Sequence, residues 1–115
     1  MNKFWRAAAG ILSGLRATTH WAAFDRLKLW GAIPSEARVM EDGKVITAAG
    51  VSVGIDMALV LSAKIAGPHF AHSIQLGIEY DPEPPFDVGS PKKAHPEIRK
   101  ALSARMQAAF ETENL

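Results

Sequence analysis

The sequence contains no cysteine and has almost no excess charge of either sign. Without cysteine, the 115 residues can form no disulfide, no cysteine-ligated zinc or iron–sulfur site, and no cysteine nucleophile. Thirteen basic and 12 acidic residues give a formal net charge of +1. This balance argues against a strongly basic nucleic-acid-binding protein and against a basic peptide that coats a membrane surface.

Long apolar runs are also missing. The most apolar segment, residues 45–66, carries the charged residues Asp56 and Lys64, whereas a membrane-spanning helix needs about 20 predominantly apolar residues. A signal peptide needs a longer apolar core than the short stretch near the N-terminus, which Arg6 interrupts. We therefore expect no membrane span and no secretion signal, and a cytoplasmic location.

What the chain does contain is typical of a globular protein. Hydrophobic residues make up 48% and charged residues 22%, which is too apolar for a disordered chain. A length of 115 residues allows one domain with a modest core.

The spacing of apolar and turn-forming residues predicts the secondary structure. Gly14 and Gly31 are typical helix ends, and Asp42-Gly43 is typical of a hairpin turn. The expected elements are a helix over 4–12, a strand over 17–21, a helix over 22–30, a hairpin of 38–41 with 44–48, helices over 53–66 and 68–80, an extended proline-rich segment over 81–86 and a helix from Pro96.

The helix over 53–66 is apolar on nearly every side, which predicts burial on more than one face. Ser52 is its expected N-cap, and Asp56 is expected to favour the helix start through the helix dipole. The last helix has an expected inner stripe of Ile98, Ala101, Leu102, Arg105, Met106, Ala109 and Phe110.

This order of elements favours an α/β layered fold, but the strands are too few. Only residues 17–21 have the composition of a parallel strand, and a sheet covered on both faces needs several. The sequence therefore predicts that part of the fold is supplied from elsewhere, by a partner chain or by an N-terminal half.

Five segments occur in the order found in a known family. They are residues 10–14 (GILSG), 16–21 (RATTHW), 41–51 (EDGKVITAAGV), 54–59 (GIDMAL) and 74–86 (IQLGIEYDPEPPF). The chain thus resembles the DJ-1/PfpI family, whose fold is that of class I glutamine amidotransferases. The last segment, with Gly89-Ser90-Pro91, resembles the isonitrile hydratase branch of that family.

The resemblance implies a fold, a reaction and a missing group. Residues 1–115 would form a single partial domain, the C-terminal half of a flavodoxin-like three-layer sandwich with a β-hairpin. Isonitrile hydratases convert isocyanides to N-substituted formamides, which suits a thiolate nucleophile and a proton donor. The family cysteine would lie at or just before Met1, and its acidic partner earlier. The isolated chain is therefore expected to be inactive.

The resemblance also identifies candidate site residues. His20 corresponds to a family histidine near the cysteine, and it is the candidate catalytic residue; a histidine packed at a strand end or dimer contact is the alternative. Thr19 and Trp21 are candidate pocket residues, although Trp21 also suits a core or an interface. The segment Gly50-Val51-Ser52 can present helix-start N–H groups to an anion, and a plain helix start is the alternative.

Other chemistry is not favoured by the sequence. Ser13 and Ser52 lack the elbow motif and base that a serine nucleophile needs. His69 and His72 lie three residues apart, with no third ligand evident, so we expect no metal site and no cofactor. The expected partners are a second copy or a complementing N-terminal half, and a small molecule, but no nucleic acid by the chain itself. A non-catalytic dimerisation, ligand-sensing or regulatory module remains the alternative function.

Overall fold

The computed structural model describes residues 10–113. Most of the helix expected over residues 4–12 lies outside this range. The elements, in chain order, are β1 (Arg16–Ala17), the 3₁₀ turn η1 (Trp21–Ala23), α2 (Arg26–Leu29), β2 (Ile33–Pro34), β3 (Val39–Asp42), β4 (Val45–Ala48), the 3₁₀ turn η2 (Val51–Val53), α3 (Gly54–Ala66), α4 (Pro68–Gly77) and α5 (Pro96–Glu113).

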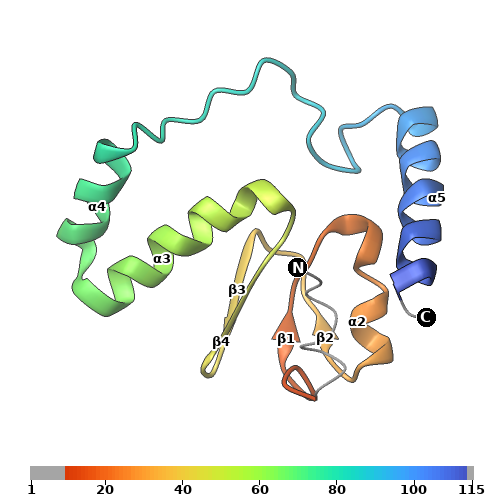
Figure 1. Cartoon of the computed structure of the whole chain (residues 1–115), viewed down its shortest axis with the longest axis horizontal. Helices are drawn as coiled ribbons and strands as arrows, with labels where there is room; N and C mark the ends of the chain where they lie inside the picture. The colour runs from red at the N-terminus through yellow and green to blue at the C-terminus, as the bar shows by residue number, and fades with distance from the viewer. Residues whose placement is uncertain (1–9, 114–115) are drawn as a thin grey trace.

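Two small sheets form the centre of the described chain (Figure 1). β1 pairs in parallel with β2, with Arg16 opposite Ile33. Flanking bonds extend this pair, because the Gly14 N–H donates to the Gly31 carbonyl at 2.8 Å and the Ser35 N–H donates to the Ala17 carbonyl at 2.9 Å. The sequence did not predict β2, since a two-residue strand ending in proline carries almost no periodic signal.

The strand expected over 17–21 is wrong beyond Ala17. Thr18 is held by other groups: its N–H donates to Thr47 Oγ1 and its hydroxyl donates to the Ala37 carbonyl, both at 3.0 Å. His20 then caps η1 instead of ending a strand. The helix expected over 22–30 is likewise split, into η1 and the short helix α2.

The hairpin prediction is confirmed, with the loop displaced by one residue. Asp42 pairs with Val45, so the two loop residues are Gly43 and Lys44 rather than the expected Asp42 and Gly43. Gly43 has φ of +60°, a conformation that glycine adopts at little cost. A positive φ at the first loop position alone is typical of the turns that match the twist of paired strands.

Helices α3 and α4 form an arm that extends away from the sheets (Figure 1). They meet at Gly67, whose φ of +90° ends α3, and Pro68 begins α4 as predicted. The predicted Ser52 cap is wrong, because Ser52 lies within η2 and no side chain caps α3. Burial on more than one face is also wrong for this chain. No residue of α3 is buried, and Ile65 is 78% exposed.

The core is small and lies around β1, α2 and β2. Leu12, Ala17, Leu27 and Ala32 form it, with Phe24, Trp30 and Val45 packed against it. An extended connection through the proline-rich residues 81–86, predicted from the sequence, leads from α4 to α5. None of the helices within residues 10–113 combines the length and apolarity that crossing a bilayer requires.

Helix α5 begins at Pro96 as predicted, but its inner face differs from the expected stripe. The half-buried positions are Ser103, Met106, Gln107 and Phe110, whereas Ile98 is 59% exposed. Only Met106 and Phe110 of the predicted stripe therefore face the chain. The helix contacts η1 through its second half, so the apolar residues near its start remain exposed.

Candidate functional site

One cavity collects all six candidate residues. Its volume is about 900 Å³, and it lies between η1, the end of β4 and the start of α3. Residues 89–92 of the long connection line another part of its wall. The candidate residues that line it are Thr19, His20, Trp21, Gly50, Val51 and Ser52. The structure thus brings two segments about 30 residues apart to one site, and their chemical roles remain predictions.

His20 is held by the turn that it caps. Its Nδ1 accepts a hydrogen bond from the Ala22 N–H at 3.1 Å. An accepting Nδ1 carries no proton, so the neutral ring carries its proton on Nε2. The Cδ2 edge of the same ring faces Gly50, where a Cβ added to the glycine would lie 3.8 Å from Cδ2. The Trp21 ring lies beside His20, with ring centroids 5.4 Å apart.

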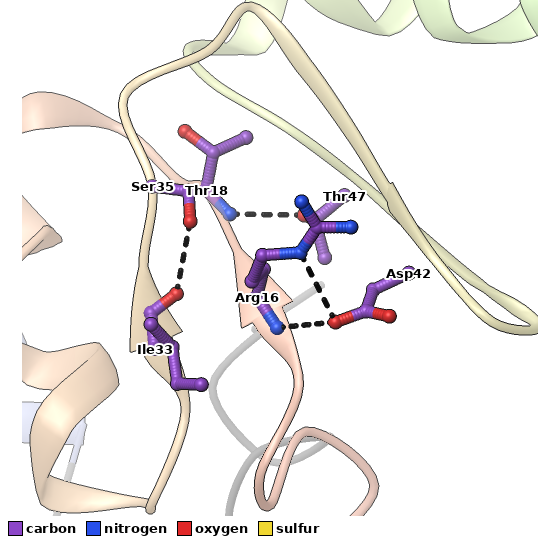
Figure 2. A network of polar contacts seen from close by, with 6 residues as sticks. All are labelled: Arg16, Thr18, Ile33, Ser35, Asp42 and Thr47. Atoms are coloured by element: carbon purple, nitrogen blue, oxygen red, sulfur yellow. Dashed lines mark hydrogen bonds and ion pairs between the residues drawn. The ribbon is translucent and has the colours of Figure 1, made fainter.

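Two threonines precede the histidine, and both are buried. Thr18 ties this segment to the hairpin through Thr47, as Figure 2 shows beside the Arg16–Asp42 contacts. Thr19 is 6% exposed, and its buried hydroxyl has no hydrogen-bond partner in the described part of the chain. Such a group is costly unless it is satisfied. Thr19 also lines the cavity, so its hydroxyl is suited to bind a polar group placed there.

The opposite wall begins at Gly50. Val53 is buried and its N–H donates to the Gly50 carbonyl at 3.0 Å, which starts η2. Val51 between them is 92% exposed, an unusual exposure for an apolar residue in a cavity wall. η2 continues directly into α3, so the positive end of the helical segment points toward the cavity. Ser52 has an exposed side chain on the same wall.

The start of α3 is held by a polar cluster that no sequence pattern predicted. Asp56 accepts hydrogen bonds from Arg38 Nη2 at 2.6 Å and from the Tyr80 hydroxyl at 2.5 Å. The hydrogen bond from Tyr80, followed by that from Arg38, lowers the pKa of Asp56 below its usual value. The same bond raises the pKa of Tyr80. Asp56 lies in the first turn as predicted, and it also joins α3 to residues before β3 and after α4.

Arg38 connects this cluster to the cavity. It lines the cavity wall, and it also lines an adjoining pocket of about 610 Å³ with Tyr80 and residues of the proline-rich segment. No sequence motif marked Arg38, because its role depends on a partner 18 residues later. An arginine at the first position of a predicted hairpin strand was the available signal.

The remaining candidates lie elsewhere. Ser13 does not line the cavity; it lies beside Gly31. His69 and His72 lie edge to face on the exposed helix α4, with ring centroids 6.4 Å apart. Within residues 10–111, no three histidine, aspartate or glutamate side chains come close enough together to hold a metal ion.

Comparison with curated proteins gives two relatives. The chain is 52% identical over 87 residues to isonitrile hydratase of Pseudomonas putida, a match that covers 76% of this chain and 38% of that enzyme. It is 41% identical over 69 residues to the HTH-type transcriptional regulator CdhR of Pseudomonas aeruginosa, covering 56% and 20%. The match thus spans well under half of either relative.

Solved structures agree on the fold. A ThiJ/PfpI family protein from Pseudomonas syringae superposes with a TM-score of 0.85 at 44% identity, over 90% of this chain and 43% of that one. A DJ-1 superfamily protein from Salmonella typhimurium, solved as a cysteine-to-alanine mutant, gives a TM-score of 0.56 at 29% identity, over 66% and 40%. The predicted flavodoxin-like, glutamine-amidotransferase-like fold is therefore confirmed.

The family model agrees with these relatives. The model of the DJ-1/PfpI family matches residues 3–64, which include both the His20 segment and the start of α3. This match covers more than half of the chain, and the chain belongs to the DJ-1/PfpI family.

Proposed function

We propose that this chain supplies the pocket of an isonitrile hydratase-type site. The supporting observation is that six candidate residues line one cavity in a chain 52% identical to isonitrile hydratase of Pseudomonas putida over 87 residues. The reaction adds water to an isocyanide, R–N≡C, and yields the formamide R–NH–CHO. The proposal includes a cytoplasmic location, which suits relatives that are an enzyme and a transcriptional regulator.

The reaction needs a nucleophile that these residues lack. A thiolate adds to the terminal isocyanide carbon, which takes up a proton to give the thioimidate R–N=CH–S–Cys, with the sulfur still bound to its protein. Water then adds to that carbon, the C–S bond breaks, the thiol is released and nitrogen gains a proton. Because the chain has no cysteine, we propose that it is inactive alone and that a complementing chain or segment supplies the thiol.

The chain's own groups have defined tasks in this proposal. His20, with its proton on Nε2, donates a hydrogen bond to bound substrate or to the nitrogen of the intermediate, which gains a proton as water adds. The Thr19 hydroxyl, buried at 6% exposure, provides a second polar contact. The positive end of the helical segment at Val51 stabilises the negative charge of the thiolate.

A non-catalytic role is the second candidate, favoured by a different observation. Large apolar residues are exposed along the arm, among them Ile65 at 78% and Leu76 at 81%. An apolar surface of this kind indicates a protein contact. We propose that a second copy or a complementing chain covers it, so the chain could also serve as a dimerisation or ligand-sensing module.

The test is isocyanide hydration with and without a supplied thiol. The purified chain is mixed with an N-terminal fragment of the Pseudomonas putida enzyme that carries its cysteine, and formamide is measured by mass spectrometry. We expect product from the mixture, none from the chain alone, and a loss of at least about tenfold with His20→Ala. A mixture that forms a stable complex but no formamide would reject the enzyme proposal and favour the non-catalytic role.

A further inference from the structure

The C-terminal helix contacts the turn that carries His20. Gln107 Nε2 donates a 2.7 Å hydrogen bond to the Ala22 carbonyl, across 85 residues of sequence. One helical turn later, the Phe110 ring lies 4.9 Å from the guanidinium carbon of Arg26, the first residue of α2. Residues three apart share a helix face, so α5 holds both η1 and α2. Figure 1 shows α5 running beside α2.

Ala22 links this contact to the histidine. Its carbonyl accepts from Gln107, and its N–H donates to His20 Nδ1 at 3.1 Å. Ala22 is 7% exposed, so little solvent is available to replace either bond. The two groups belong to successive peptide units joined at the Ala22 Cα, so holding the carbonyl restricts the backbone rotation that would carry the N–H away from Nδ1. Holding the carbonyl therefore helps to hold the N–H that selects the protonation site of the imidazole.

We propose that Gln107 is a positioning residue for His20. Through Ala22 it keeps Nδ1 as an acceptor, so the ring proton remains on Nε2 and the Cδ2 edge faces Gly50. The hydrogen bond at one ring nitrogen decides which form of the other nitrogen is available for chemistry. The inference rests on the proposed function in assigning His20 a task in the cavity, but the geometry of the link is independent of the reaction.

The experiment reads the imidazole directly. In the ¹⁵N-labelled full chain at a pH where the ring is neutral, two-bond ¹H–¹⁵N correlation spectra identify which ring nitrogen carries the proton. We expect a single Nε2–H form in the parent chain. Gln107→Leu should produce a measurable Nδ1–H population and make the Ala22 amide exchange about fivefold faster. Gln107→Lys, which retains a nitrogen donor, should restore the parent spectrum.

The chain offers a matched control in its other glutamine. Gln75 on α4 also donates through Nε2 to a backbone carbonyl, that of Tyr80 at 3.0 Å. Gln75→Leu should leave both the His20 tautomer and Ala22 exchange unchanged. A folded Gln107→Leu with the parent tautomer and exchange rate would overturn the proposal. Loss of the folded spectrum in Gln107→Leu would also overturn it, since Gln107 would then be a general structural residue.

The two proposals fail separately. If the tautomer changes as expected while a complex with a cysteine-bearing fragment makes no formamide, the positioning role stands and the hydratase function is rejected. If formamide forms but the tautomer is insensitive to Gln107, the function stands and the positioning role is rejected.

Discussion

The sheet region and the helical arm differ in how far their apolar residues are buried. Around β1, β2 and α2, Leu12 and Leu27 are buried to 6% and 4% exposure. Along α3 and α4, apolar residues are at least as abundant, but of these helices only Ala71 is buried. The cavity lies where the two regions meet. The sheet region therefore buries its own apolar residues, whereas the arm leaves most of its apolar residues exposed or half-buried.

The largest expected effect is on the core of the sheet region. Leu27→Ala should lower the free energy of unfolding by about 2–5 kcal/mol, because it removes buried methyl groups and leaves a cavity. Leu61→Ala on α3, where the side chain is 43% exposed, should cost less than about 1 kcal/mol. Urea denaturation measures both. Equal losses of unfolding free energy in the two variants would contradict the difference in packing between the two regions.

The next effect concerns self-association through the arm. We expect the chain to sediment as a dimer or larger species, because the exposed apolar surface favours association. The double variant Ile65→Glu with Leu76→Glu should shift it to a monomer. Leu29→Glu is the matched control, since Leu29 is 76% exposed but belongs to α2. A parent chain that is already monomeric at high concentration would contradict this prediction.

The Asp56 cluster joins the two regions and should make their contact sensitive to pH. The pKa of Asp56 is lowered in the folded state, so its contribution is present above the unfolded value of about 3.9 and is lost as pH falls through the folded value. The pKa of Tyr80 is raised, so its contribution is lost above about pH 10.

Asp56→Asn should reduce stability at neutral pH by about 1 kcal/mol and flatten the acid limb. Tyr80→Phe should flatten the alkaline limb. Chemical denaturation at several pH values measures both changes. Unchanged pH profiles in the two variants would show that the cluster does not connect the regions.

The smallest expected effect is at the cavity wall. Gly50 has φ of −69°, which any residue adopts, and an added Cβ would make ordinary contact with His20. Gly50→Ala should therefore change stability by less than about 0.5 kcal/mol while shifting the His20 ring signals in NMR spectra. A large loss of stability would indicate that the two walls are packed more tightly than in this structure.

Local signals predicted most of the elements, and long-range contacts account for the errors. The glycine at the hairpin turn, Gly67-Pro68 and Pro96 act on neighbouring backbone, so the hairpin, the α3–α4 break and the start of α5 were predictable. β2 was not, because its two residues form a strand only by pairing with β1. The strand expected over 17–21 is wrong because Thr18 bonds to the Ala37 carbonyl, 19 residues later, and to the Thr47 side chain, 29 residues later.

For the site, too, some residues were predictable from the sequence and others depend on long-range contacts. The six candidate residues were identified by resemblance, and the structure places all of them on one cavity. Arg38 and the loop over residues 89–92 line it too, but no local pattern could indicate that residues so distant meet. Gln107 was not predicted for the same reason, since its helical periodicity gives no information about Ala22.

The most direct test of the account is the distance between its two cavity walls. A nuclear Overhauser measurement on the full chain should detect a contact between the His20 ring proton on Cδ2 and the Gly50 α-protons, because a Cβ on Gly50 would lie 3.8 Å from that carbon. Observing this contact would support a single pocket built from both segments. A folded chain without it would contradict the shared pocket and the function proposed for it.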